Sequence, residues 1–233
     1  MVNYINTQLD KVKEIAIAFL YLDITPCGYG LVQHPYFEFE IVNSDNGSIN
    51  ILEDPKGREY IFQKYIQKIN NIQSYIEFSC LIRKSYLLTF LKYTKDYISI
   101  DDMSKFLSDA YQRSENPNND PNMPKSTLIS LFKKSNKELI MDQEEFSIYQ
   151  NLPQNLVIYR GVGGKLDLKK AKALSWTTDF EIAKWFALHF SKNGIVFKGI
   201  IEHSHIYSYF NLEKECVVDY KTVNLIDQIF VSK

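Results

Sequence analysis

A change of pattern near Leu156 constrains the fold of this chain most strongly. Before that position, apolar residues recur every three or four places, which is typical of amphipathic helices. After it, strand-like apolar runs dominate. The sequence therefore predicts an α+β protein, in which a helical N-terminal part packs on a small mixed β-sheet.

Residues 1–150 form the mainly helical part. Helices are expected over 4–22, 57–96, 99–111, 126–134 and 143–150. The second of these is either one long helix or two joined ones, and Ser99 and Ser126 stand where N-caps belong. The turn sequence Ser44-Asp45-Asn46-Gly47 predicts a β-hairpin over 36–52.

Residues 151–233 form a β-rich part, either as a separate domain or as one continuous domain with the helices. Strands are expected over 156–160, 195–201, 216–218 and 222–231. One helix, 179–190, interrupts them, with Thr178 or Asp179 as its expected cap. The buried stripe of this helix is expected to consist of Ile182, Ala183, Phe186, Ala187 and Phe190, which leaves Trp185 off the core face.

The composition limits the partners and the location. The formal net charge of −1 gives no global attraction for nucleic acid or an anionic membrane. The three cysteines are far apart and form no Cys-x-x-Cys pattern, so reduced thiols in a cytoplasmic protein are expected. The apolar run over 12–22 is too short to span a bilayer, so we expect a core helix and no membrane partner.

Three short motifs stand out in the last third of the chain. Arg160 ends a strand-like run, Ser175-Trp176-Thr177 stands at the head of a helix-like segment, and Glu213-Lys214-Glu215 opens another apolar run. Because side chains alternate along a strand, the two glutamates are expected on one face, about 7 Å apart. Two carboxylates so close repel each other, which suits catalysis better than stability.

The ordered trio resembles the Arg-Ser-Glu class of mono-ADP-ribosyltransferases, over roughly 156–219. These enzymes split NAD at the nicotinamide–ribose bond and pass ADP-ribose to an acceptor. The resemblance implies a core of two facing sheets, with NAD in the cleft between them. Two departures are clear, because the family's Ser-Thr-Ser reads Ser175-Trp176-Thr177 here.

The resemblance also implies a role for each matched residue. Arg160 would bind the NAD pyrophosphate, and the backbone of Gly161 the nicotinamide carboxamide. Ser175 would orient the catalytic glutamate and hold the nicotinamide ribose. Glu215 would stabilise the positive charge that develops on the ribose, and Glu213 would orient or deprotonate the acceptor. The alternative for Arg160 is a structural arginine at a strand end, and for Ser175 a plain end-of-strand serine.

Two further residues are assigned to the NAD site. Thr177 would share the hydroxyl role of Ser175. Trp185 would stack on nicotinamide, as an aromatic does at a comparable place in related transferases; the alternative is that it covers the N-terminal helices.

Other candidates carry weaker signals. Tyr207, Tyr209 and Phe210 lie in a segment that the family uses to meet its target, and the alternative is core packing. His203 and His205 are expected on one strand face, at a spacing that can suit a metal. Two ligands make a poor zinc site, so we expect no metal.

The resemblance therefore predicts an NAD-dependent mono-ADP-ribosyltransferase that acts inside a cell as a toxin, an antiviral defence effector or a modifier of host factors. NAD is its substrate, the acceptor is protein arginine or nucleic acid, and an antitoxin protein is a possible partner. One alternative is an NAD glycohydrolase with water as acceptor. Another is a catalytically inactive binding module.

Overall fold

The structure is a computed structural model that describes residues 6–45 and 47–233. The chain forms two compact units, of which the first ends at Pro117 and the second is Asn118–Lys233. The division falls at the short 3-10 turn η3 (Pro117–Asn119) and not near residue 150. The helices expected over 126–134 and 143–150 therefore belong to the same unit as the strands.

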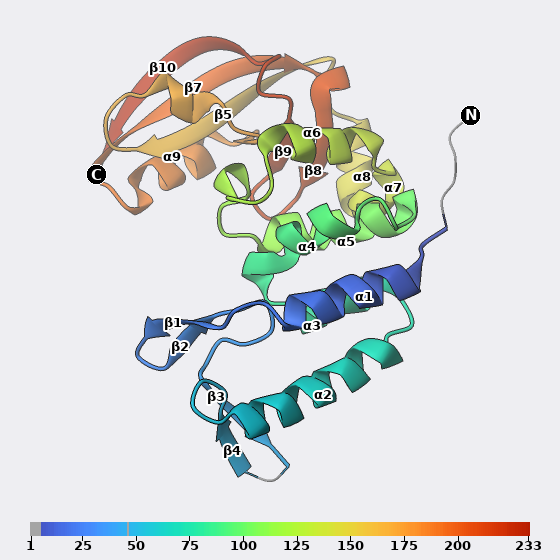
Figure 1. The fold of residues 1–233 in the computed structure, drawn as a ribbon. Coiled ribbons are helices and arrows are strands. Elements are labelled where there is room, and N and C mark those ends of the chain that lie inside the picture. Colours follow the sequence, from blue (N-terminus) through green and yellow to red (C-terminus); the bar gives the residue numbers. More distant parts are fainter. Residues whose placement is uncertain (1–5, 46) are drawn as a thin grey trace. The chain divides into compact units, whose positions relative to one another are not determined.

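The first unit consists of helices and two small hairpins (Figure 1). Its helices are α1 (Leu9–Leu20), α2 (Pro55–Asn71), α3 (Phe78–Leu81), α4 (Leu87–Thr94) and α5 (Ile100–Arg113), with 3-10 turns η1 (Tyr75–Glu77) and η2 (Lys84–Tyr86). Its strands are β1 (Thr25–Gly28), β2 (Leu31–Gln33), β3 (Ile41–Ser44) and β4 (Gly47–Asn50).

The long helix expected over 57–96 is broken into several pieces. Ile72 adopts an extended conformation after α2, and a capping box between Ser74 and Glu77 begins the next turn. Ser99 caps α5 as expected, by accepting a hydrogen bond from the amide of Asp102. The hairpin of β3 and β4 is present, although residue 46 of its turn lies outside the described residues, as do residues 4 and 5 of the first expected helix.

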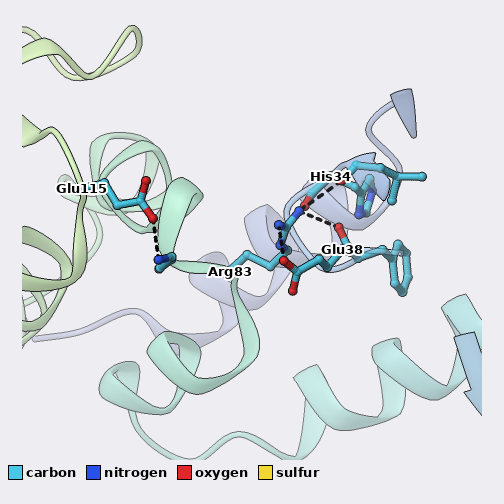
Figure 2. Close-up of polar contacts among 7 residues, drawn as sticks. His34, Glu38, Arg83 and Glu115 are labelled. Atoms are coloured by element: carbon cyan, nitrogen blue, oxygen red, sulfur yellow. Dashed lines mark hydrogen bonds and ion pairs between the residues drawn. The ribbon is translucent and has the colours of Figure 1, made fainter. Parts of the chain in front are cut away.

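Arg83 holds the loop that follows β2 (Figure 2). Its Nη1 donates to the carbonyl oxygens of Phe37 at 2.8 Å and Val32 at 3.2 Å. Its Nη2 lies 3.5 Å from a carboxylate oxygen of Glu38. One side chain thus bonds to a carbonyl of β2 and to one of the loop that follows, which ties the loop to the strand.

His34 lies in this loop with its ring fully buried. The ring stacks on Phe37 at a centroid distance of 4.7 Å, and its Nδ1 accepts a hydrogen bond from the amide of Tyr36. Nε2 has no hydrogen-bond partner among the described residues. Burial lowers the pKa of His34 to about 4, against a weaker opposite effect of the nearby main chain at Leu20 and Leu22.

This burial predicts a specific acid sensitivity of the first unit. Because the pKa of His34 is low in the folded state, its contribution to stability is full above the unfolded pKa of about 6.5 and is lost as the pH falls. The free energy of unfolding should drop by up to ~1.4 kcal/mol per pH unit between about 6.5 and 4 on account of this group.

Urea unfolding at a series of pH values tests this expectation. His34→Asn keeps a hydrogen-bond acceptor for the amide of Tyr36 but cannot titrate, so its unfolding should depend less on pH. His205→Asn, in the second unit, is the control and should keep the wild-type slope. Equal slopes for all three proteins would contradict the assignment to His34.

In the second unit, the described residues form a six-stranded sheet and four helices. The helices are α6 (Lys125–Lys134), α7 (Lys137–Ile140), α8 (Gln143–Gln150) and α9 (Phe180–His189), with 3-10 turns η4 (Leu168–Ala171) and η5 (His203–His205). The strands are β5 (Asn155–Gly163), β6 (Ser175–Thr177), β7 (Asn193–Glu202), β8 (Ile206–Phe210), β9 (Glu215–Val218) and β10 (Asn224–Ser232).

The strand order is β10-β7-β5-β6-β9-β8, and every neighbouring pair is antiparallel. The expectation of a mixed sheet was wrong, because each strand returns beside an oppositely directed neighbour. The two facing sheets implied by the resemblance are also replaced by one sheet. Its two halves, β10-β7-β5 and β6-β9-β8, are joined by the single residue pair Tyr159–Thr177.

Helix α9 covers one face of β5, β7 and β10 (Figure 1). Ala183 and Ala187 are fully buried there and form a cluster with Val196 of β7. The expected buried stripe is confirmed at Ala183 and Ala187 but wrong at Phe186 and Phe190, which are 40% and 95% exposed. Small residues face the sheet because the helix backbone lies close to it, which leaves no room for phenyl rings.

Two other expectations for the second unit have clear outcomes. Helix α6 begins at Lys125 after Pro124, so Ser126 lies within the helix and does not cap it. Asp179 is the cap of α9, where it accepts hydrogen bonds from the amides of Glu181 and Ile182. Throughout the described part of the chain, none of the helices combines the length and the apolar character that a membrane crossing requires.

Candidate active site

The strand order brings the three motifs together, although they are up to 55 residues apart (215 − 160). The Arg160 motif is on β5, Ser175 and Thr177 form the ends of β6, and Glu215 begins β9. Thr177 pairs directly with Glu215 on one side and with Tyr159 of β5 on the other. Directly paired residues of neighbouring strands point to the same face, so Thr177 and Glu215 are side by side.

Arg160 lies within β5 and not at its end as expected. Its Nη1 donates to the carbonyl oxygen of Ser175 at 2.7 Å, and its Nε donates to that of Lys170 at 3.0 Å. The side chain therefore links β5 to the start of β6, where the ladder between these strands has already ended. Tyr159 pairs with Thr177, and side chains alternate along a strand. The side chain of Arg160 therefore leaves β5 on the face opposite Thr177 and Glu215.

The Ser-Trp-Thr motif divides its side chains between the two faces of the sheet. The Thr177 hydroxyl donates to the carbonyl oxygen of Glu213 at 2.8 Å and accepts from the amide of Asp179 at 3.1 Å. Trp176 points the other way and is 2% exposed, with its Nε1 donating to the carbonyl oxygen of Ala173. The large residue at the middle position thus fills the core and does not enter the site.

The Glu-x-Glu motif is not the two-residue strand repeat that we expected. Only Glu215 belongs to β9, whereas Glu213 and Lys214 lie in the turn after β8. Lys214 has a positive φ of 45°, which breaks the alternation of side chains. The expectation that both carboxylates share one strand face, about 7 Å apart, is therefore wrong.

An ion pair fixes this turn against α9. Lys214 Nζ lies 2.7 Å from a carboxylate oxygen of Asp179, the residue that caps α9. This contact and the helix amides lower the pKa of Asp179. The same turn is held from its other side by α8, because Glu145 accepts a hydrogen bond from the amide of Asn211 at 3.0 Å.

Glu145 is a positioning residue that the sequence analysis did not assign. It is 8% exposed, and its carboxylate also accepts from the amide of Asp142 in a capping box. The pattern Asp142-x-x-Glu145 signals the cap, but not the second contact to Asn211. That contact needs β8 to end beside α8, which no local pattern encodes.

The carboxyl group of Glu213 has a raised pKa. Burial raises the pKa of its carboxyl group, and no charged neighbour contributes to the shift. Repulsion between the two glutamates, on which the sequence argument depended, is therefore not the cause. A half-buried carboxyl with a raised pKa is suited to accept or donate a proton nearer neutral pH.

Gly161 serves the packing of α9. A Cβ atom there would lie 1.6 Å from the carbonyl oxygen of Ala183, and one at Gly194 2.3 Å from that of Ala187. The space beside Gly161 that its missing side chain leaves is therefore filled by the helix. This geometry argues against a contact between nicotinamide and the Gly161 backbone from that side.

Gly161→Ala should consequently destabilise the second unit by at least ~3 kcal/mol, because two backbones would have to separate. The matched control is Gly163→Ala on the same strand, where the nearest atom is 3.3 Å from the new Cβ and the cost should stay below ~1 kcal/mol. Thermal unfolding of both variants measures the difference. Equal melting temperatures would mean that α9 can shift without cost.

The remaining expected residues lie elsewhere. Trp185 faces a pocket lined by Glu181, Lys184, Leu188, His189 and Lys233, with no residue of the three motifs. Tyr207, Tyr209 and Phe210 are buried in β8, which agrees with core packing. His203 and His205 lie in η5 and not on a strand, and the described residues hold no group of three metal-ligating side chains.

Comparison with models of protein families gave no match, and neither did searches of curated proteins and of solved structures.

Proposed function

We propose that this protein is an NAD-dependent mono-ADP-ribosyltransferase. The observation that supports this best is the adjacency of β5, β6 and β9, which carry the Arg, Ser-x-Thr and Glu motifs in neighbouring positions. Thr177 opposite Glu215 supplies a hydroxyl beside a carboxylate on one face. The proposal also rests on the resemblance of these motifs to the Arg-Ser-Glu class.

The proposed reaction begins with cleavage of the bond between nicotinamide and ribose. The bonding electrons leave with nicotinamide, and positive charge develops on the ribose. A fixed carboxylate at Glu215 stabilises this charge more in the transition state than in the ground state. The acceptor then bonds to the ribose carbon and loses a proton to Glu213, whose raised pKa makes it a better base than an ordinary glutamate.

Arg160 acts in this proposal through the frame of the site. Its bonds to the carbonyls of Ser175 and Lys170 hold the start of β6 in place beside β5. Binding of the NAD pyrophosphate by the same guanidinium remains a proposal from the resemblance. Two parallel hydrogen bonds to an anion suit a guanidinium better than an ammonium group.

Glu215→Gln tests the central assignment. The two side chains are nearly isosteric, so the fold should be retained while the charge is lost. Nicotinamide release from NAD should fall by about 10²-fold or more, the scale for one electrostatic stabiliser. The control is Glu202→Gln at the exposed end of β7, which should release nicotinamide at the wild-type rate. Unchanged release by the Glu215 variant would exclude it as the catalytic carboxylate.

Glu213→Gln tests the choice between transfer and hydrolysis. The variant should still release nicotinamide slowly but should lose transfer of labelled ADP-ribose to macromolecules in a lysate. Since burial raises the pKa of Glu213, wild-type transfer should be lost on acidification at a higher pH than an ordinary glutamate would give. Equal loss of both signals would mean that Glu213 supports Glu215 or the cleft, and would remove the reason to prefer a transferase over an NAD glycohydrolase.

The proposed biological role is the one that the resemblance to the Arg-Ser-Glu class implies. As a transferase, the protein would act inside a cell as a toxin or an antiviral defence effector, and an antitoxin protein would be its partner. The acceptor is either protein arginine or nucleic acid, and label found on protein or on RNA in the lysate assay distinguishes the two.

A further inference from the structure

The outward face of α9 carries a row of aromatic rings that neither the fold nor the proposed site uses. Trp185 contacts Phe186 at a centroid distance of 4.9 Å and His189 at 4.2 Å, and His189 contacts Phe190 at 4.2 Å. Positions i, i+1, i+4 and i+5 lie on one side of a helix. We call these four residues the aromatic ladder.

The aromatic ladder is exposed to an unusual degree for its composition. Trp185 is 55%, Phe186 40% and Phe190 95% exposed. The face opposite Trp185 is formed by the buried residues Ala183 and Ala187. A contiguous row of exposed rings on one helix is a typical feature of a binding surface, whereas single exposed apolar residues are not.

A pocket and a local positive charge accompany the ladder. The pocket has a volume of about 390 Å³ and is lined by Trp185, His189 and the amino-group side chains of Lys184 and Lys233. Lys192 is adjacent, because the amide of Lys233 donates to its carbonyl oxygen at 3.0 Å. The carboxylate that lines the pocket, Glu181, lies 3.8 Å from Lys184.

We propose that the aromatic ladder binds single-stranded nucleic acid. Unpaired bases stack on exposed aromatic rings, and lysines beside the rings attract the phosphate backbone. The several rings in a row exceed what one base of a mononucleotide or of NAD requires. Because Lys184 is paired with Glu181, the positive charge beside the ladder comes from Lys192 and Lys233, although the whole chain has a net charge of −1.

The position of the ladder connects it with the proposed active site. Trp185 is six residues after Asp179, which corresponds to about 9 Å along the helix. Asp179 is ion-paired to Lys214 between the two glutamates. The ladder therefore lies on the helix whose cap residue is ion-paired to the turn of Glu213, and nucleic acid bound there would be the acceptor. This last step rests on the proposed transferase function, whereas binding itself does not.

Tryptophan fluorescence provides a direct measurement, because of the two tryptophans Trp185 is exposed and Trp176 is buried. An oligothymidylate of about 15 nucleotides should quench the emission and bind with an affinity that falls as salt is raised. Binding of a labelled oligonucleotide should weaken by about 10-fold or more in Trp185→Ala and in Phe190→Ala. Lys192→Gln should reduce the dependence of binding on salt.

Phe230→Ala is the matched control, since this phenyl ring is 72% exposed on β10 but is not part of the ladder. It should bind the oligonucleotide as the wild type does. Equal affinity of all variants would overturn the proposal, as would binding of anionic vesicles without binding of oligonucleotide, or quenching of Trp185 by NAD alone.

The outcomes also separate this inference from the proposed enzyme. If Phe190→Ala, a ladder residue outside the proposed NAD site, loses oligonucleotide binding while nicotinamide release persists, both stand. Oligonucleotide binding by a protein that releases no nicotinamide would retain the ladder and reject the transferase.

Discussion

One residue pair, Tyr159 opposite Thr177, joins the two halves of the sheet in the second unit. The ladder between β5 and β7 is long, whereas β5 and β6 share this one pair and are also connected by the side chain of Arg160. The arginine replaces main-chain hydrogen bonds that the short strand cannot make. The candidate site lies at this junction, so the groups that would do chemistry are also those that hold the halves together.

The close approach of α9 to one face of β5 and β7 explains a second set of features. Gly161 and Gly194 leave space for the helix backbone, and alanines are then the largest residues that fit between helix and sheet. The large rings of the helix must consequently point outward. Exposure of the aromatic ladder is therefore a direct result of glycines on two neighbouring strands.

Much of the second unit could be predicted from local patterns. The apolar runs located β5, β7 and β10 to within a few residues, and α8 begins and ends where its pattern indicates. The α+β class follows from the same patterns. Ser175, Thr177 and Glu215 do lie at strand starts or ends as their motifs indicate, whereas Arg160 lies within β5.

The errors share a physical origin in contacts between distant segments. The buried face of α9 is set by glycines on its partner strands, which the periodicity of the helix cannot reveal. The break in the helix expected over 57–96 depends on a capping box at Ser74, which the spacing of apolar residues does not reveal. The bonds of Arg160 to Ser175 and Lys170 depend on how β6 meets β5, which the sequence near Arg160 does not encode.

The conformation of Lys214 limits which sequences can build this site. A residue with φ of 45° is tolerated best as glycine, asparagine or aspartate, and β-branched residues are strongly disfavoured there. The ion pair with Asp179 requires a positive charge at position 214. Glycine and asparagine carry no charge, and aspartate would repel Asp179. The middle position of Glu-x-Glu is thus under two opposing demands, and related chains that change it should change residue 179 as well.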